Sequence, residues 1–348
     1  MVRMPRVSVV IPVLNEAGCL PKLHHELRSV CDPLPYQFEF VFVDDGSTDR
    51  TVESLSHIRR SDERVCYLRL SRNFGHQSAL SAGLAHASGD AVIMMDGDLQ
   101  HPPSLITTLL DRWHAGYDIV NTVRVETEDI KKSKKILSRL FYRVFNLLAN
   151  VEIEPGNADF RLMSRAAVNV LNELPERHRF LRGLIPWMGF TQARVEFRAP
   201  SRWAGSSKYT FKRNVRFALE GITAFSFYPL RLVTIFGSLI AAASLLYGLV
   251  AMTFHLFGGQ TVPGWTSLLL CLLFFGGSQL VVLGIIGEYV GRTLEQVKGR
   301  PLYIVRDSEG FSLSHARHGT VPSPHWARPG PTRAGAWKEK TSSNDVAL

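Results

Sequence analysis

The sequence predicts an α/β domain with a mostly parallel sheet, followed by a hairpin of two transmembrane helices. Three observations lead to this fold class. In the first hundred residues, short apolar runs alternate with polar loops and helical patterns. Two long uncharged apolar runs follow, at residues 232–257 and 266–287. The length of 348 residues suits one large domain or two modest ones.

The first strand is expected at residues 7–11, a run rich in β-branched residues that Pro12 ends. Asn15 and Glu16 follow this strand and precede a helical pattern. In parallel sheets, ligands bind at the carboxyl ends of the strands. The two polar residues therefore stand where a ligand would be bound.

The second strand is expected at residues 38–43 and ends in a polar turn that begins with Asp44. Asp45 and Asp49 in this turn are explained by turn and N-cap roles. Asp44 is instead expected to share a site with the acidic residues that follow the fourth strand. Several carboxylates at one sheet edge repel one another unless a cation or a hydrogen-bond donor satisfies them.

The third strand is expected at residues 65–70, and a polar loop joins it to a helix of small residues at 79–87. That loop contains His76, for which a packed or surface position is expected instead of a ligand role. Strand, polar loop and helix thus recur, which is typical of an α/β class with a mostly parallel sheet.

The fourth strand, residues 91–95, ends in Asp96-Gly97-Asp98, with Gln100 close behind. Two carboxylates at i and i+2 point to the same side of an extended chain. They offer clustered oxygen ligands of the kind that hold Mg²⁺ or Mn²⁺ together with the phosphates of a substrate. A lone Asp-x-Asp also suits a polar turn, but here four polar clusters fall at the same sheet edge.

The composition limits the possible partners. A net charge of +9 suits an anionic partner, such as a phosphorylated ligand or an acidic lipid surface. Nucleic acid is not expected, because no basic motif with interleaved aromatic residues occurs. The four cysteines contain no C-x-x-C pair, which indicates reduced residues in a cytosolic compartment. No signal peptide is expected, since the N-terminal residues lead directly into a strand pattern.

Each of the two apolar runs is long enough to cross ~30 Å of hydrocarbon as a helix. A buried hairpin in a soluble core is disfavoured, because two adjacent uncharged runs of this length are rare there. The link at 258–264 carries no charge, whereas basic residues such as Arg231 and Arg292 flank the pair on its outer sides. The positive-inside bias therefore predicts both termini in the cytoplasm.

Two further segments, 134–149 and 208–225, combine apolar residues at helical spacing with several Lys and Arg residues. Core helices with solvated basic faces would show the same pattern, but the neighbouring spans favour a membrane-surface position. A disordered tail is expected after about Asp307, where Ser, Pro, Gly and charged residues dominate. The expected divisions are a domain at 1–228, two transmembrane helices at 229–292, and a cytoplasmic tail at 293–348.

Several segments together resemble the family 2 glycosyltransferases with a GT-A fold. These are VVIPVLNE at 9–16, VDDGSTD at 43–49 and MDGDLQHP at 95–102. NADFRLM at 157–163 and RWAGSSKY at 202–209 resemble a narrower branch. That branch comprises the polyprenyl-phosphate glycosyltransferases related to dolichol-phosphate mannose synthase, including bacterial enzymes with two C-terminal spans. The resemblance covers residues 7–306, with one departure at 157–158, where many relatives have Gly next to the Asp.

The resemblance implies a nucleotide-sugar site at the carboxyl edge of the sheet. Pro12, Asn15 and Glu16 would line the pocket for the nucleobase and ribose, and Asp44 would hydrogen-bond the base. Arg124 would contact phosphate.

The resemblance also implies a metal site on the diphosphate of the donor. Asp96, Asp98 and Gln100 would hold Mg²⁺ or Mn²⁺, and Asp96 would in this way also bind the nucleotide sugar.

On the acceptor side, the resemblance implies three basic or polar contacts and one carboxylate. Asp159 would lie near the sugar and acceptor as the candidate catalytic base. Arg202, Ser207 and Lys208 would grip the acceptor phosphate, and Arg202 and Lys208 would also take part in catalysis. The base role stays open, because a lipid phosphate with a second pKa of about 6 is already an anion near neutral pH. Direct attack by this phosphate would invert the sugar.

The implied function is metal-dependent, inverting transfer of one sugar from a UDP- or GDP-linked donor to polyprenyl (undecaprenyl) phosphate. The expected place is the cytoplasmic face of the inner (plasma) membrane, with membrane lipids as further partners. A processive polysaccharide synthase is the alternative enzyme, but residues 179–182 lack the Gln and Trp of its Q-x-x-R-W segment. A non-catalytic membrane scaffold is the other alternative. A homo-oligomer, the sugar, the nucleotide, the lipid length and the pathway are left open by the sequence.

Overall fold

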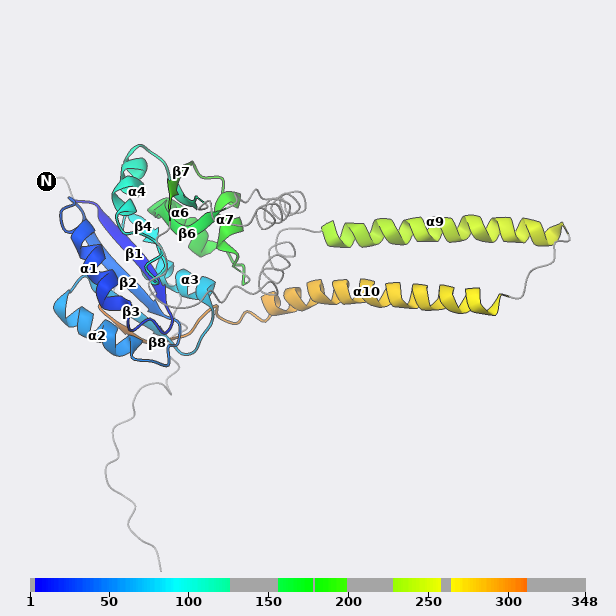
Figure 1. The fold of residues 1–348 in the computed structure, drawn as a ribbon, viewed down its shortest axis with the longest axis horizontal. Coiled ribbons are helices and arrows are strands. Elements are labelled where there is room, and N and C mark those ends of the chain that lie inside the picture. The colour runs from blue at the N-terminus through cyan, green and yellow to red at the C-terminus, as the bar shows by residue number, and fades with distance from the viewer. Residues whose placement is uncertain (1–3, 126–155, 178, 199–227, 258–263, 312–348) are drawn as a thin grey trace, which may run out of the picture.

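The computed structural model describes residues 4–125, 156–177, 179–198, 228–257 and 264–311 (Figure 1). The amphipathic segments expected at 134–149 and 208–225 lie outside the described residues. The loop that carries Arg202, Ser207 and Lys208 lies outside them as well.

An eight-stranded sheet forms the centre of the first domain, in the order β7-β5-β6-β4-β1-β2-β3-β8. The four strands expected from the sequence are β1 (Arg6–Val13), β2 (Gln37–Asp44), β3 (Val65–Leu70) and β4 (Ala91–Met94). They pair in parallel with one another. Four of the seven strand pairings are parallel, which confirms the predicted α/β class with a mostly parallel sheet.

The other half of the sheet brings later parts of the chain beside β4. It consists of β5 (Ile119–Arg124), β6 (Asn157–Ser164) and β7 (Gln192–Phe197). Strand β6 runs antiparallel to both β4 and β5. In the register of β4 and β6, Met94 pairs with Arg161. Continuing this antiparallel register by two residues sets Asp96 opposite Asp159.

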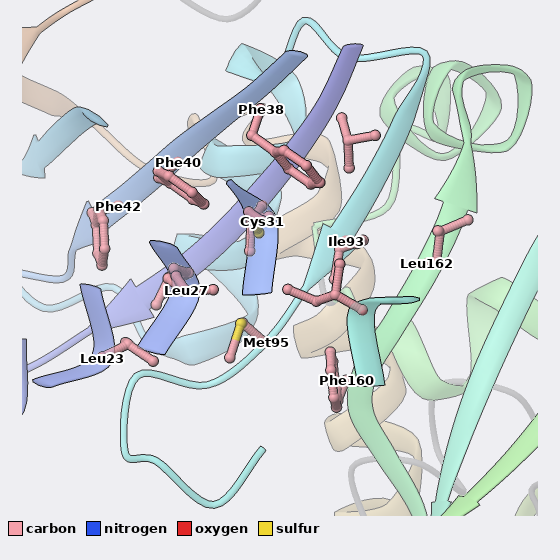
Figure 2. Packing of buried hydrophobic residues seen from close by; sticks show 14 of the residues in the cluster. Leu23, Leu27, Cys31, Phe38, Phe40, Phe42, Ile93, Met95, Phe160 and Leu162 are labelled. Carbon is pink, nitrogen blue, oxygen red and sulfur yellow. The ribbon is translucent and has the colours of Figure 1, made fainter. Parts of the chain in front are cut away.

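Helices cover both faces of this sheet. They are α1 (Leu20–Cys31), α2 (Thr51–Ser61), α3 (His76–His86), α4 (Leu105–His114), α6 (Arg165–Glu173) and α7 (Leu181–Trp187). Successive strand residues point to opposite faces, so Val9 belongs to one buried cluster and Val10 to the other. Figure 2 shows the first cluster, with Phe40 and Phe42 of β2 near Leu27 of α1.

On the opposite face, helix α3 packs very closely against β1. A Cβ added at Gly83 would clash with the side chain of Val10, so this position needs a glycine. The close contact holds α3, which begins at His76, against the central strands.

Two long helices project from the domain side by side, α9 (Tyr228–Leu256) and α10 (Trp265–Val297) (Figure 1). Their apolar side chains are largely exposed, as Leu239 and Leu280 show. Within the part of the chain that the structure describes, the segment Phe274–Val297 is long and apolar enough to cross a membrane. The expected two-span hairpin stays a prediction.

The chain is ordered further towards its C-terminus than the sequence predicts. Strand β8 (Val305–Glu309) pairs antiparallel with β3. The disorder expected after about Asp307 is therefore corrected for Ser308 and Glu309, which belong to this strand, and residues after 311 lie outside the described residues. Tyr303 just before it is buried, and the hydroxyl of Tyr67 donates a hydrogen bond to Glu309. Strand β8 lies at the edge of the sheet, and most of its residues are polar and exposed. Because it lacks the apolar run of a buried strand, the sequence does not reveal it.

Candidate active site

The polar residues expected at the carboxyl ends of β1 and β2 lie close together. The Asn15 side-chain oxygen accepts a hydrogen bond from the backbone N–H of Thr48 at 2.9 Å. The Asn15 backbone N–H donates to the hydroxyl of Ser47, also at 2.9 Å. Asn15 has a φ of +58°, a left-handed conformation that Asn tolerates better than most residues. The loops after β1 and β2 are thereby tied into one wall.

Asp44 lies fully buried at the base of this wall. Its carboxylate accepts a hydrogen bond from the backbone N–H of Ser47 at 3.1 Å, and the Nε of Arg69 lies 4.0 Å away. Pro12 pairs with Val43, immediately before Asp44. Glu16 is attached to the same wall, since its backbone N–H donates to the hydroxyl of Thr51 at 3.0 Å. The predicted pocket residues Pro12, Asn15, Glu16 and Asp44 are therefore neighbours.

Of the two other aspartates of the second turn, Asp49 has a local role, whereas Asp45 does not have the turn or N-cap role expected for it and instead binds a loop about 30 residues away. Asp49 accepts hydrogen bonds from the backbone N–H and the hydroxyl of Thr51, which agrees with the predicted turn role; the N-cap of α2 is Arg50 and not Asp49. Asp45 accepts from the backbone N–H groups of Phe74 and Gly75 at 2.7 and 3.0 Å. Burial raises the pKa of Asp45, although these two hydrogen bonds oppose that effect. Asp45 thus holds the loop that leads to α3.

Asp96 lies between two histidines. His76 Nε2 lies 3.4 Å from its Oδ1, and His101 Nε2 lies 3.7 Å from its Oδ2. The backbone N–H of Asp96 also donates to His101 Nδ1 at 2.9 Å. The surface position expected for His76 agrees with a side chain that is 42% exposed, and its ring nitrogen also lies 3.7 Å from Asp159, a contact that the sequence did not indicate. The residues around His76 in the sequence do not indicate these two carboxylates, because both come from distant parts of the chain.

Asp98 and Gln100 follow Asp96 in a tight turn. The carboxylate of Asp98 accepts from the backbone N–H of Gln100 at 3.1 Å, and Leu99 between them has a φ of +62°. The side-chain oxygen of Gln100 accepts a hydrogen bond from Arg124 at 3.3 Å. Arg124 ends β5, so this contact brings the predicted phosphate-binding arginine next to the Asp-x-Asp turn.

The oxygen ligands of this turn fit a divalent cation that also binds phosphate. Asp96 Oδ1 is buried and accepts no hydrogen bond from the described residues, since His76 Nε2 at 3.4 Å is only an electrostatic neighbour. Those residues contain no group of three His, Cys, Asp or Glu side chains that could hold a metal ion. Mg²⁺ is usually bound by only one or two carboxylates, with substrate phosphates completing its ligands. Asp96 and Asp98 meet that requirement.

Asp159 lies buried near the start of β6 and is paired with an arginine that the sequence alone does not single out. Arg182 of α7 donates two hydrogen bonds to its two carboxylate oxygens, both at 2.9 Å. Arg161 lies 3.8 Å away and is fully buried. Nothing in the sequence around Arg182 signals a partner 23 residues away.

These cations determine the ionisation of Asp159. Burial would raise the pKa of Asp159, but the charge of Arg182, hydrogen bonds from His76 and Arg182, and the charge of Arg161 outweigh it. The pKa of the carboxyl group is therefore held well below its usual value. Desolvation would lower the pKa of His76, but Asp159 and Asp96 raise it. The carboxylate is thus stabilised in its charged form.

Sequence comparisons with known proteins all point to glycosyltransferases. The profile described as Glycosyl transferase family 2 matches residues 8–171. An uncharacterized glycosyltransferase of Synechocystis sp. is 43% identical over 88% of this chain and 96% of its own length. The SfII prophage-derived bactoprenol glucosyl transferase of Shigella flexneri is 41% identical over 87% of this chain and 98% of its own length.

Solved structures are more distant. The mannosyl-3-phosphoglycerate synthase from Rubrobacter xylanophilus is 17% identical, with a TM-score of 0.47 over 67% of this chain and 75% of that chain.

Proposed function

The chain belongs to glycosyltransferase family 2, and from that membership we propose that it transfers one sugar from a nucleotide sugar to a polyprenyl phosphate in the membrane. Relatives named bactoprenol glucosyl transferase, about 40% identical over most of this chain, support a lipid-linked acceptor. The long exposed apolar helices agree with an acceptor that is itself anchored in a bilayer.

The observation that carries the proposal is the pairing of β4 with β6. It sets Asp96, on the donor side, across from Asp159, and His76 lies within 4 Å of both carboxylates. A group transfer needs donor and acceptor sites on either side of one reacting atom. The edge between these two strands offers such a place at the carboxyl end of the parallel strands.

On the donor side, we assign the nucleobase and ribose to the wall formed by Pro12, Asn15, Glu16 and Asp44. The diphosphate would lie near Arg124 and the turn after β4. There Asp96 and Asp98 would hold Mg²⁺ or Mn²⁺, with Gln100 beside them. The chemistry that such a cation supplies is neutralisation of the negative charge on the departing diphosphate.

On the acceptor side, a phosphate oxygen of the lipid forms a bond to the anomeric carbon. The bond from that carbon to the diphosphate breaks, and its electron pair leaves with the diphosphate, so the sugar is inverted. The lipid phosphate is an anion near neutral pH and needs no base to remove a proton. We therefore assign Asp159 the role of orienting Arg182 and the sugar. Arg202, Ser207 and Lys208 would bind the acceptor phosphate.

The experiment is a transfer assay with purified full-length protein in lipid nanodiscs that contain undecaprenyl phosphate. Radiolabelled UDP- and GDP-sugars are offered one at a time, with Mg²⁺ or Mn²⁺, and the organic phase is counted. We expect one nucleotide sugar to label the lipid, and EDTA to stop the reaction. The absence of labelled lipid with every donor would overturn the proposal. Labelled polymer instead of a lipid monosaccharide would favour the processive alternative.

A further inference from the structure

Helix α10 is longer than a membrane requires. Its 33 residues rise about 50 Å, whereas the hydrocarbon core of a bilayer is about 30 Å thick. The charged residues Glu288, Arg292 and Glu295 all fall in its last ten residues, and Glu288 pairs with Arg292 at 3.0 Å. The uncharged part of α10, from Trp265 to Gly287, alone rises about 35 Å and is enough to cross the hydrocarbon core, although the apolar segment Phe274–Val297 extends to the end of the helix. We therefore treat the last ten residues, 288–297, as a helical stalk of about 15 Å between the membrane and the catalytic domain.

The chain after the stalk turns back to the catalytic domain within a few residues. Gly299 has a φ of +62°, which ends the helix in the left-handed conformation that glycine favours. Tyr303 is then buried in the core, and the carbonyl of Ile304 accepts a hydrogen bond from the backbone N–H of Ser71. Only 298–302 separate the stalk from this anchor. A stalk held through such a turn alone could change its angle to the domain.

One side chain of the stalk also contacts the catalytic domain directly. The amide of Gln296, in the last turn of α10, makes two hydrogen bonds to the backbone of the catalytic domain. Its oxygen accepts from the N–H of Arg177 at 2.9 Å, and its nitrogen donates to the carbonyl of Pro175 at 2.7 Å. Both partners lie about 120 residues earlier in the chain. We call this paired contact the Gln296 latch.

The Gln296 latch binds the backbone just before helix α7, which contributes to the acceptor side of the candidate site. Four residues after Arg177, helix α7 begins, and it carries Arg182, which holds both oxygens of Asp159. The backbone N–H of Leu181 also donates to the side chain of Gln77, next to His76. The end of the stalk is thus connected through one short segment to the groups around Asp159.

We propose that Gln296 is a positioning residue that fixes the catalytic domain at one angle to the membrane stalk, so that the acceptor side of the site faces the lipid phosphate. This inference rests on the proposed transfer to a membrane-anchored phosphate. A domain that samples many angles presents its site correctly for only a fraction of the time, and its apparent affinity for a membrane-bound substrate falls by that fraction. An acceptor in solution reaches the site at any angle.

The test compares Gln296→Ala with the wild type in nanodiscs, using two acceptors. For undecaprenyl phosphate in the bilayer, we expect the KM to rise about tenfold, which corresponds to about 1.4 kcal/mol. For a water-soluble short-chain prenyl phosphate, and for the nucleotide sugar, we expect unchanged KM values. Hydrogen exchange of the Arg177 amide should become faster, because that N–H loses its acceptor.

Val297→Ala is the matched control, since this neighbouring side chain is 76% exposed. It should behave like the wild type in every measurement. An unchanged KM for the bilayer acceptor in Gln296→Ala would overturn the proposal. Equal losses with both acceptors would also overturn it, because they would indicate general damage to the site. If the wild type transfers sugar to neither acceptor, the proposed function fails, and the exchange rate of Arg177 alone decides whether the latch exists.

Discussion

Replacing Arg182 with Ala should destabilise the protein and slow transfer, because it leaves Asp159 as a buried carboxylate without its bidentate partner. Two charge-assisted hydrogen bonds of 2.9 Å are lost. Removing one partner of a buried ion pair typically costs about 3–5 kcal/mol. His76 and Arg161 remain at 3.7 and 3.8 Å, so the lower end, about 3 kcal/mol, applies. For a domain of this size the melting temperature should fall by about 6–12 °C.

The assay is thermal unfolding of the purified protein in detergent, at several pH values. Asp159 has a lowered pKa in the folded protein, so its stabilising contribution is present above the unfolded pKa of about 3.9. That contribution is lost as the pH falls through the folded pKa. Without Arg182 the folded pKa rises. The difference in melting temperature between wild type and Arg182→Ala should therefore be greatest above about pH 4 and should narrow at lower pH.

Two controls distinguish loss of the Arg182–Asp159 pair from a general destabilisation of the fold. Arg182→Lys keeps the charge but not the two parallel hydrogen bonds, so it should fall between wild type and Arg182→Ala. In a double-mutant cycle with Asp159→Asn, the two losses should not add, because each variant already breaks the same pair. A melting temperature of Arg182→Ala within 2 °C of the wild type, or additive losses, would refute this account of Asp159.

Three further predictions concern the metal, the acceptor and the membrane. Asp98→Ala should abolish transfer to lipid while the melting temperature stays near the wild type, because the side chain is only partly buried; near-normal transfer that still requires a metal would contradict its role as a ligand. Lys208→Ala should lower the transfer rate by about 30- to 1000-fold, the scale of one lost electrostatic stabiliser, with little change in nucleotide affinity measured by calorimetry. Small, equal losses in both measurements would identify a surface lysine. A cysteine probe at Gln260 should be labelled from outside intact cells and one at Ser343 should not; the reverse result would disprove the expected topology.

The central strands, and the closeness of the residues proposed to bind the donor, could be predicted from the sequence because their signals are local. A strand that is buried on both faces reads as a continuous apolar run, as β1 and β4 do. The polar residue after such a run then lies at the carboxyl edge by geometry alone. Asn15, Asp44 and Asp96 followed from this rule.

The acceptor side could not be predicted in the same way, because its contacts join residues that are distant in the chain. Arg182 is one of several arginines in its segment, and only the packing of α7 selects it as the partner of Asp159. His76 opens a helix of small residues and becomes part of the site through the pairing of β4 with β6. Gln296 is an ordinary polar residue at a helix end until the chain folds back at Gly299.

The pairing of Asp159 with Arg182 also explains how a carboxylate can lie where an anion must bind. The proposed acceptor is a phosphate, and an unpaired carboxylate beside it would repel it. Two parallel hydrogen bonds from a guanidinium cancel that charge and fix the orientation of the arginine. A carboxylate whose pKa is held so low is a weak base at neutral pH. The same contact that makes Asp159 a poor proton acceptor therefore makes it compatible with an anionic acceptor, which needs no proton removed.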